Sequence, residues 1–254
     1  MIHRIVTGAQ GFLGLALTRS LRAAPGYLLA VDRVPGKEVE AVDVTDIAFH
    51  ERLRQFLIGA TRAELYNAAG SVPDLACIVD IPPTEFQLVL NDNLVVSYAT
   101  ARAFAEAASA LKVTASITFL GSVGAARSHR YKIAYDAAMA GTEALARGFA
   151  LEYASAGITT RVAALGPIAD SRTSIEDGGR SGDLVSLVPA RRYPTVDEVA
   201  TAVIAFGGSA FDIATGAVVP LDAGLTQQLR PADVERSPVP THRTHTGTAS
   251  GSAG

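Results

Sequence analysis

The 254-residue sequence has few of the features that mark several large classes of protein. A single cysteine, Cys77, excludes a disulfide within the chain and a metal site built from several cysteines. We interpret Cys77 as a small apolar residue, with a reactive thiol as the alternative. No block of lysine and arginine stands out, and the formal net charge is −3. Nucleic acid is therefore not expected as the main partner.

Long apolar runs are also missing. No stretch approaches the ~20 apolar residues that cross a bilayer. The N-terminus, MIHRIVTGAQG, has no apolar segment followed by a cleavage site, so we expect no signal peptide. Together these absences predict a cytoplasmic protein with no membrane partner. The 48% of hydrophobic residues still allow a substantial core, and the length suits one large α/β domain.

Strand-like and helical patterns alternate along the chain. Apolar strand candidates lie at 2–6, 27–31, 39–44, 64–66, 114–120, 158–165 and within 215–224, and helical patterns at 13–23, 47–57, 84–111, 131–153 and 195–206. This alternation predicts an α/β fold: a Rossmann-type doubly wound parallel sheet of about seven strands, in a single domain over 1–229. Ligands of such sheets bind at the carboxyl ends of the strands.

Residues 230–254 are rich in Pro, Thr, Ser and Gly and lack the apolar mass for a core. We predict a low-complexity C-terminal tail that is disordered or docks on a neighbouring subunit. His242 and His245 have a spacing that a metal could use, but in such a tail we predict no metal site.

A glycine-rich turn follows the first strand. Glycine lets the backbone turn sharply and lets a phosphate approach, and the N-terminus of the next helix offers N–H groups to that phosphate. Asp32, which ends the second strand, suits the ribose hydroxyls of a dinucleotide and would repel a 2′-phosphate. The adjacent Arg33 leaves NADP open, although NAD is favoured. The alternative is an ordinary turn without a ligand. The predicted residues of the turn are Gly8, Gln10, Gly11, Phe12, Leu13 and Gly14.

A second segment, 117–141, places a hydroxyl and a phenol in related positions. Ser122 follows an apolar strand, and Tyr135 lies thirteen positions later on an Ala-rich helix. The two side chains could meet over one substrate oxygen. Together with the glycine-rich turn, this segment resembles the short-chain dehydrogenase/reductase family, and the resemblance covers about Ile2 to Thr226.

The resemblance implies a role for further residues. Tyr135 would be the proton donor and acceptor, Ser122 the group that polarises the substrate oxygen, and Asn93 the support of a proton relay. The family usually assembles through the helices matching 84–111 and 131–153, which implies a homodimer or homotetramer. Further cofactor contacts implied by the family are Asp43, Val44, Asn67, Ala68, Ala69, Gly70, Pro167 and Ile168, with a hydroxyl from Ser171 or Thr173.

Two of these positions have a structural alternative. Asn67 suits a role in holding the sheet together better than a role in chemistry. Asp43 precedes a helix start, at which Thr45 or Asp46 would be the N-cap.

Met139 stands where the family has a catalytic lysine. In the family that lysine holds the nicotinamide ribose, and its charge stabilises the tyrosinate, whereas free tyrosine titrates near ~10. Three responses stay open: another cation substitutes, the enzyme works mainly as a reductase, or redox chemistry is lost. The candidate cations are Lys132, which would share a helix side with Tyr135, and Arg127, His129 and Arg130 in the preceding loop.

We therefore predict an NAD(H)-dependent oxidoreductase that interconverts a small-molecule ketone and a secondary alcohol and favours reduction. The alternative is a non-redox protein of the same fold, either a dehydratase or isomerase or a nucleotide-binding module. A polar, Gly-rich segment at 170–192 is expected to lie over the substrate. It carries no charge cluster that would specify a phosphate or carboxylate, so the substrate itself is not predicted.

Overall fold

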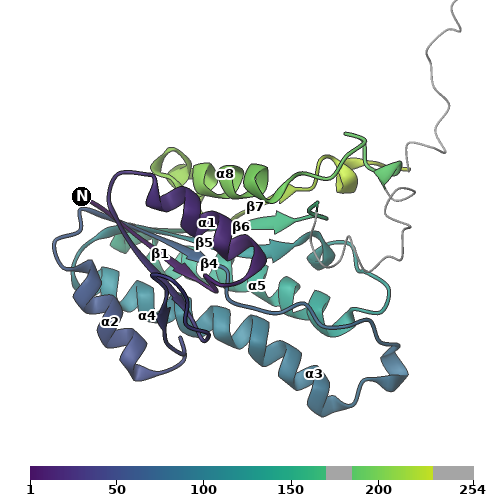
Figure 1. Ribbon diagram of the computed structural model, residues 1–254, viewed down its shortest axis with the longest axis horizontal. Helices are drawn as coiled ribbons and strands as arrows, with labels where there is room; N and C mark the ends of the chain where they lie inside the picture. The colour runs from purple at the N-terminus through teal and green to yellow at the C-terminus, as the bar shows by residue number, and fades with distance from the viewer. Residues whose placement is uncertain (170–184, 231–254) are drawn as a thin grey trace, which may run out of the picture.

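Seven parallel strands form one sheet in the order β3-β2-β1-β4-β5-β6-β7 (Figure 1). The computed structural model describes residues 1–169 and 185–230. This sheet confirms the predicted doubly wound α/β fold. The strands are β1 Ile2–Thr7, β2 Tyr27–Asp32, β3 Glu40–Ala41, β4 Arg62–Asn67, β5 Thr114–Ser122, β6 Ile158–Leu165 and β7 Ala217–Leu221.

Helices cover both faces of the sheet, as Figure 1 shows. One face is covered by α1 and α8, whose apolar residues Leu17, Val203 and Phe206 form a core cluster with the strands. The other face is covered by α2, α4 and α5, with Phe49 and Phe104 among their core residues. The helices are α1 Phe12–Arg22, α2 Ile47–Leu57, α3 Pro83–Leu90, α4 Val96–Ala110, α5 Ile133–Tyr153 and α8 Val196–Gly207.

The direction of chain winding reverses between β1 and β4. Because β1 pairs with β2 on one side and with β4 on the other, the carboxyl ends of these strands are where the ligands of doubly wound sheets bind. The segments after β1, β2, β4, β5 and β6 all leave the sheet at this edge. The fold therefore gathers the predicted site residues from positions far apart in the sequence.

The long helical pattern predicted over 84–111 is interrupted by one wide turn. A π-helical segment, η2 Asn91–Val95, joins α3 to α4. Leu88 and Val95, which the apolar periodicity would have buried, are 62% and 46% exposed. The buried side of this region instead carries Asn93 and Ser97, which are hydrogen-bonded to other parts of the protein. The predicted apolar stripe therefore faces outward at Leu88 and Val95, whereas Ala103, further along it, is buried as expected.

The edge next to β2 differs from the expectation. The strand predicted over 39–44 has two residues, because the chain turns away after Ala41 and Val44 packs into the core. Asp46 occupies the N-cap position of α2 but its side chain caps nothing. Thr45 does not cap the helix either, since its N–H and hydroxyl both donate to Asp43. The predicted side-chain cap was therefore wrong.

A buried charge network lies toward the amino end of the sheet, away from the carboxyl ends of the strands. Arg161 of β6 is fully buried and donates to the Phe206 carbonyl and, at 3.0 Å, to Asp212. Arg62 donates to both carboxylate oxygens of Asp212. Burial alone would raise the pKa of Asp212, but these hydrogen bonds outweigh it and hold the pKa below its usual value.

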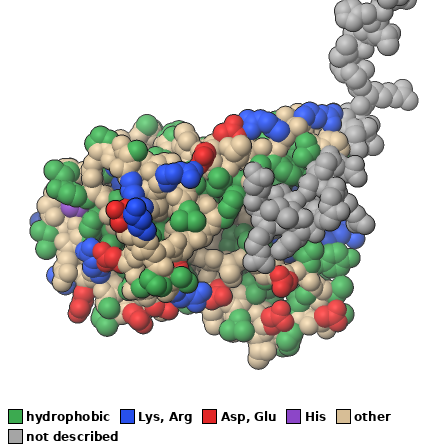
Figure 2. Space-filling view, viewed as in Figure 1, with side chains coloured by type: hydrophobic (Ala, Val, Ile, Leu, Met, Phe, Trp, Pro, Cys, Tyr) green, Lys and Arg blue, Asp and Glu red, His purple; other side chains and the backbone are tan. Residues whose placement is uncertain are grey.

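Surface features bear on possible partners. Over 1–169 and 185–230, no helix combines the length and apolarity that crossing a bilayer requires. On the face drawn in Figure 2, acidic and basic side chains are interspersed over the described residues. The tail at 231–254, with His242 and His245, lies outside the described residues, as does most of the 170–192 segment.

Candidate active site

The glycine-rich turn is closed by backbone contacts that exclude larger residues. Gly8 has a φ of +66°, in the left-handed region that favours glycine. A Cβ on Gly14 would lie 2.0 Å from the Gly8 carbonyl oxygen. Gly11 is the N-cap of α1, and no described side chain caps this helix. The first-turn N–H groups of α1, which include those of Phe12 and Leu13, are therefore left for a ligand.

Asp32 braces this turn from the end of β2. Its Oδ2 accepts from the Gln10 N–H at 2.9 Å, and its Oδ1 accepts from the Val34 N–H at 3.0 Å. A carboxylate has about four acceptor positions, so capacity for ribose hydroxyls remains. The neighbouring Arg33 is 65% exposed, with its Nη1 3.9 Å from Oδ1 of Asp92 in η2. This contact links the end of β2 to the π-helical segment.

The turn after β4 lies against the glycine-rich turn. A Cβ on Gly8 would lie 2.5 Å from the Ala68 carbonyl oxygen and 2.8 Å from Cα of Ala69, so the two turns touch. Asn67 accepts from Thr7 at 3.2 Å and donates to the Ser97 carbonyl at 2.9 Å. It therefore ties β1, β4 and α4 together, in line with its structural interpretation.

Asn93 lies in the π-helical segment beside the turn after β4 and is 3% exposed. Its Nδ2 donates to the Val89 carbonyl at 3.0 Å, and its Oδ1 accepts from the Ser71 N–H at 3.1 Å. The end of the Asn67–Gly70 turn is thereby fixed to the helix. Both polar atoms of the Asn93 side chain have partners within the protein.

Ser122 and Tyr135 meet as the sequence predicts. Ser122 ends β5, is 6% exposed, and its Oγ accepts from the Gly124 N–H at 3.1 Å. Burial raises the pKa of Tyr135, a hydrogen bond with Ser122 partly offsets this, and the negative charge of Asp136 raises it further. The phenol is therefore neutral at physiological pH, which is the form that donates a proton.

The cations considered as substitutes for the family's lysine lie in different surroundings. Met139 is buried, one turn after Tyr135 on α5. Lys132 was predicted to share a helix side with Tyr135, but it is the N-cap, with a φ of −132°, because the helix begins one residue later. Arg127 donates to the Gln228 carbonyl at 3.3 Å. His129 bonds to Asp136.

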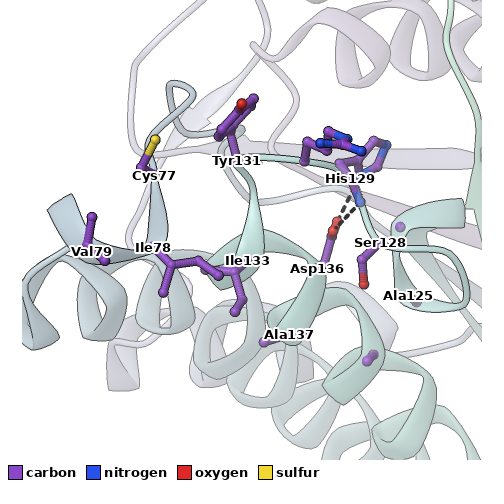
Figure 3. A pocket seen from close by; sticks show the side chains of 13 residues that line it. Cys77, Ile78, Val79, Ala125, Ser128, His129, Tyr131, Ile133, Asp136 and Ala137 are labelled. Atoms are coloured by element: carbon purple, nitrogen blue, oxygen red, sulfur yellow. Dashed lines mark hydrogen bonds and ion pairs between the residues drawn. The ribbon is translucent and has the colours of Figure 1, made fainter.

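A cavity of about 600 Å³ opens beside the first turns of α5 (Figure 3). Its wall is mostly apolar, and the His129–Asp136 pair meets at its edge. Cys77 is exposed and lines this cavity, whereas the sequence suggested a small apolar residue. The remaining lining residues are Ile78, Val79, Gly124, Ala125, Ser128, Arg130, Tyr131, Ile133, Ala137 and Ala140.

The sequence did not reveal the His129–Asp136 pair as a unit. The available signal was an acidic residue in the first turn of the helix, directly after the tyrosine.

The other implied cofactor contacts differ in how much side chain they offer. Ile168 is 9% exposed and packs in the core cluster of α8, with Pro167 half-buried before it. Val44 is likewise buried, so its side chain belongs to the core. Hydrogen bonds from Thr45 hold the pKa of Asp43 below its usual value. Ser171 and Thr173 lie outside the described residues.

Comparison with known proteins identifies the family. The sequence model of the family described as enoyl-(acyl carrier protein) reductase matches residues 16–226. The chain belongs to the short-chain dehydrogenase/reductase family. The prediction of an oxidoreductase of this type is confirmed at the level of the family.

Relatives and solved structures agree with this membership. The 3-oxoacyl-[acyl-carrier-protein] reductase MabA of Mycobacterium bovis is 28% identical over 229 residues, covering 87% of this chain and 91% of the relative. Galactitol 2-dehydrogenase of Rhizobium johnstonii is 27% identical, covering 87% of this chain and 94% of the relative. A short-chain dehydrogenase/reductase structure from Burkholderia thailandensis has a TM-score of 0.76 at 27% identity, covering 89% of this chain and 93% of that one.

A further structure shows the shared fold alone. The 3-oxoacyl-[acyl-carrier protein] reductase of Brucella melitensis, in complex with NAD, has a TM-score of 0.79 at 24% identity. It covers 89% of this chain and 97% of that one.

Proposed function

We propose that the protein is an NAD(H)-dependent oxidoreductase that interconverts a small-molecule ketone and a secondary alcohol, with reduction as its main direction near neutral pH. The observation that carries this proposal is the hydrogen-bonded pair of Ser122 and Tyr135 at the carboxyl end of β5. The pair stands at the same sheet edge as the glycine-rich turn and the uncapped N-terminus of α1.

The residues at the carboxyl ends of β1, β2 and β4 fit a nicotinamide dinucleotide. Gly8 and Gly14 leave no space for side chains where the turn closes, and the first turn of α1 offers N–H groups to a pyrophosphate. Asp32 would accept from the adenosine ribose. The nicotinamide of a bound NADH would supply the hydride. Further candidate contacts are Gln10, Gly11, Phe12, Leu13, Arg33, Asp43, Val44, Asn67, Ala68, Ala69, Gly70, Pro167 and Ile168.

NAD is proposed over NADP on the charges at the end of β2. The Asp32 carboxylate would repel a 2′-phosphate, and Arg33 is already paired with Asp92. The expected result is tighter binding of NADH than of NADPH in a titration that follows nicotinamide fluorescence. Asp32→Asn should narrow the difference, because the repulsive charge is removed while the shape is kept.

The chain's own residues suit proton donation better than proton abstraction. Tyr135 would donate its phenolic proton to the carbonyl oxygen as that oxygen gains negative charge, and the Ser122 hydroxyl would donate a hydrogen bond to the same oxygen. Burial raises the pKa of Tyr135, so the phenol is kept in the protonated form that such a step requires. Met139 brings no positive charge that would stabilise a tyrosinate. Asn93 would act through the helix it shapes.

The relatives support a ketone or secondary alcohol as the substrate. The names of the 3-oxoacyl reductase and the galactitol 2-dehydrogenase each describe a substrate of this type. We propose the same class here, without a narrower choice.

The proposed assembly is a homodimer or homotetramer formed through the outer faces of α4 and α5. Exposed apolar residues on and beside these helices support it: Leu88, Val95, Tyr98, Ile133 and Leu151.

Turnover of NADH with a panel of ketones tests the function. Tyr135→Phe is expected to lower kcat by roughly 10²–10⁴-fold with NADH binding intact, because the phenol acts in proton transfer alone. Unchanged turnover in this variant would refute the assignment. NADH that is bound but never consumed by any ketone would instead favour the non-redox alternative.

A further inference from the structure

A histidine–aspartate pair lies directly behind the Ser122–Tyr135 pair. Asp136 follows Tyr135 on α5 and is 5% exposed. Its Oδ2 accepts from the His129 backbone N–H at 2.6 Å, and its Oδ1 lies 2.8 Å from Nδ1 of the His129 ring. One carboxylate therefore holds both the backbone and the side chain of His129, as the dashed lines in Figure 3 show.

The pair is packed against the short helix that follows β5. This helix, η3 Val123–Ala125, contains Gly124, whose N–H donates to Ser122 Oγ at 3.1 Å. A Cβ on Gly124 would lie 2.2 Å from Asp136 Oδ1 and 2.7 Å from two atoms of the His129 ring. The Gly124 backbone thus lies flush against the pair. A movement of either side chain would therefore displace the Gly124 N–H, which donates to Ser122 Oγ.

We propose that Asp136, together with His129, is a positioning unit for the site: it fixes Gly124 against α5 and thereby orients the Ser122 hydroxyl toward Tyr135. This inference rests on the proposed function, in which Ser122 and Tyr135 share one substrate oxygen. It extends that function to two residues that need not touch the substrate.

The electrostatics of Asp136 agree with this role. Burial is the main cause of the raised pKa of Tyr135, and the charge of Asp136 adds to it while the Ser122 bond works against it. The fold therefore keeps an anion beside the phenol although position 139 carries no cation. The Asp136 carboxylate makes two hydrogen bonds to His129. This positioning role explains why a carboxylate lies next to the phenol.

Three substitutions separate positioning from packing. His129→Ala removes the ring bond from a side chain that is 40% exposed, so the fold is expected to survive. His129→Asn retains a donor near the position of Nδ1. Asp136→Asn keeps the shape and can keep both hydrogen bonds if the imidazole adopts its other tautomer. His50→Ala on α2 is the matched control.

Turnover gives the first measurement. His129→Ala should lower kcat for ketone reduction about tenfold or more with KM for NADH unchanged, because the misplaced hydroxyl acts on the reacting oxygen and not on the cofactor. His129→Asn and Asp136→Asn should recover most of the loss, and His50→Ala should match the native protein.

The Gly124 amide ¹H–¹⁵N resonance gives a second measurement that needs no substrate. Ser122→Ala removes the acceptor of this N–H and defines the shift that its loss produces. His129→Ala should move the resonance in the same direction, and His129→Asn should restore it. If the native protein reduces no ketone while these shifts appear, the proposed function fails and the positioning unit stands.

Two results would overturn the proposal. One is a His129→Ala protein with native kcat and a native Gly124 resonance. The other is a fall in kcat without any change of that resonance, because His129 would then act on the substrate directly and not through Gly124.

Discussion

A buried methionine at position 139 changes what the neighbouring tyrosine can do. Met139 lies one turn after Tyr135 and is 5% exposed, so it fills space without bringing charge. The carboxylate of Asp136 raises the pKa of the phenol on top of the effect of burial. The site is therefore suited to a neutral phenol.

The first prediction concerns pH. Reduction needs protonated Tyr135, so its kcat should stay flat through neutral pH and fall above the raised pKa of Tyr135. Oxidation of the alcohol needs the tyrosinate. The kcat of oxidation should therefore keep rising with pH even above the pKa of free tyrosine. Paired pH–rate profiles of both directions check this. A plateau of oxidation below the ordinary tyrosine range would contradict it.

Met139→Lys is the second prediction. A lysine ammonium near Tyr135 would stabilise the tyrosinate and lower the pKa of the phenol. The pH at which oxidation reaches half its maximum should therefore fall relative to the native protein. Met139→Leu, which is similar in volume and uncharged, is the control and should keep the native profile. Equal profiles for the lysine and leucine variants would argue against a charge effect.

The residues of the site were predictable to different degrees. Ser122 and Tyr135 could be paired from sequence, because a strand end and the next helix of a parallel sheet meet at one edge. The sequence placed Lys132 inside the helix, whereas it is the N-cap of α5, because the helix begins one residue later. Asp136 and His129 are seven positions apart, and no periodicity predicts their contact through an irregular loop.

At the scale of elements, the connection between β1 and α1 depends on glycine. The third prediction is that Gly14→Ala abolishes NADH binding, because the new Cβ would lie 2.0 Å from the Gly8 carbonyl oxygen and force the turn open. Gly148→Ala on α5 is the matched control, since nothing lies within 4 Å of a Cβ there. That control should bind NADH normally and gain roughly 1 kcal/mol in unfolding free energy. Fluorescence titration and urea unfolding give both values.

Element boundaries followed local chemistry where that chemistry was unopposed. Thr195 and Glu198 form a capping box at the start of α8, where the sequence predicts a helix over 195–206. The same reasoning failed at α2, because the N–H and the hydroxyl of Thr45 both donate to Asp43 and the Thr45 side chain does not cap the helix. The apolar periodicity did not predict the π-helical turn, although the family resemblance implies a bend of the 84–111 helix at Asn93. The signal of this turn is a polar Asn93 held by groups from outside the helix, which the sequence alone does not place.

The whole molecule is stabilised by a charge network away from the site. The fourth prediction is that Arg161→Met lowers the free energy of unfolding by about 3 kcal/mol, since it leaves buried acceptors, the Phe206 carbonyl and Asp212, short of a donor. NADH affinity at native temperature should be unchanged. Denaturant unfolding and a fluorescence titration measure the two effects. A loss of affinity in the folded variant would contradict the separation of network and site.

The fifth prediction concerns assembly. Leu151 is 86% exposed on α5 and Val95 is 46% exposed in η2, on the surface proposed for subunit contact. Leu151→Lys combined with Val95→Lys should convert the oligomer to monomers, because buried unpaired ammonium groups are costly. Light scattering of the eluted protein measures this. Ile213→Lys, at a residue 95% exposed in η5 Ser209–Ala214, is the control and should leave the mass unchanged.

The order of the strands also has a consequence for folding. Ile2 pairs with Arg62 and Ala115 with Ile158, so each central pairing closes a loop of tens of residues. Loop closure on this scale slows folding, and no short fragment contains both the glycine-rich turn and Tyr135. In the sheet, the strands β2, β1 and β4 that hold the turn pair with one another and not with β6, so we expect them to pair first. Recovery of nucleotide affinity should therefore precede recovery of turnover when the denatured chain refolds.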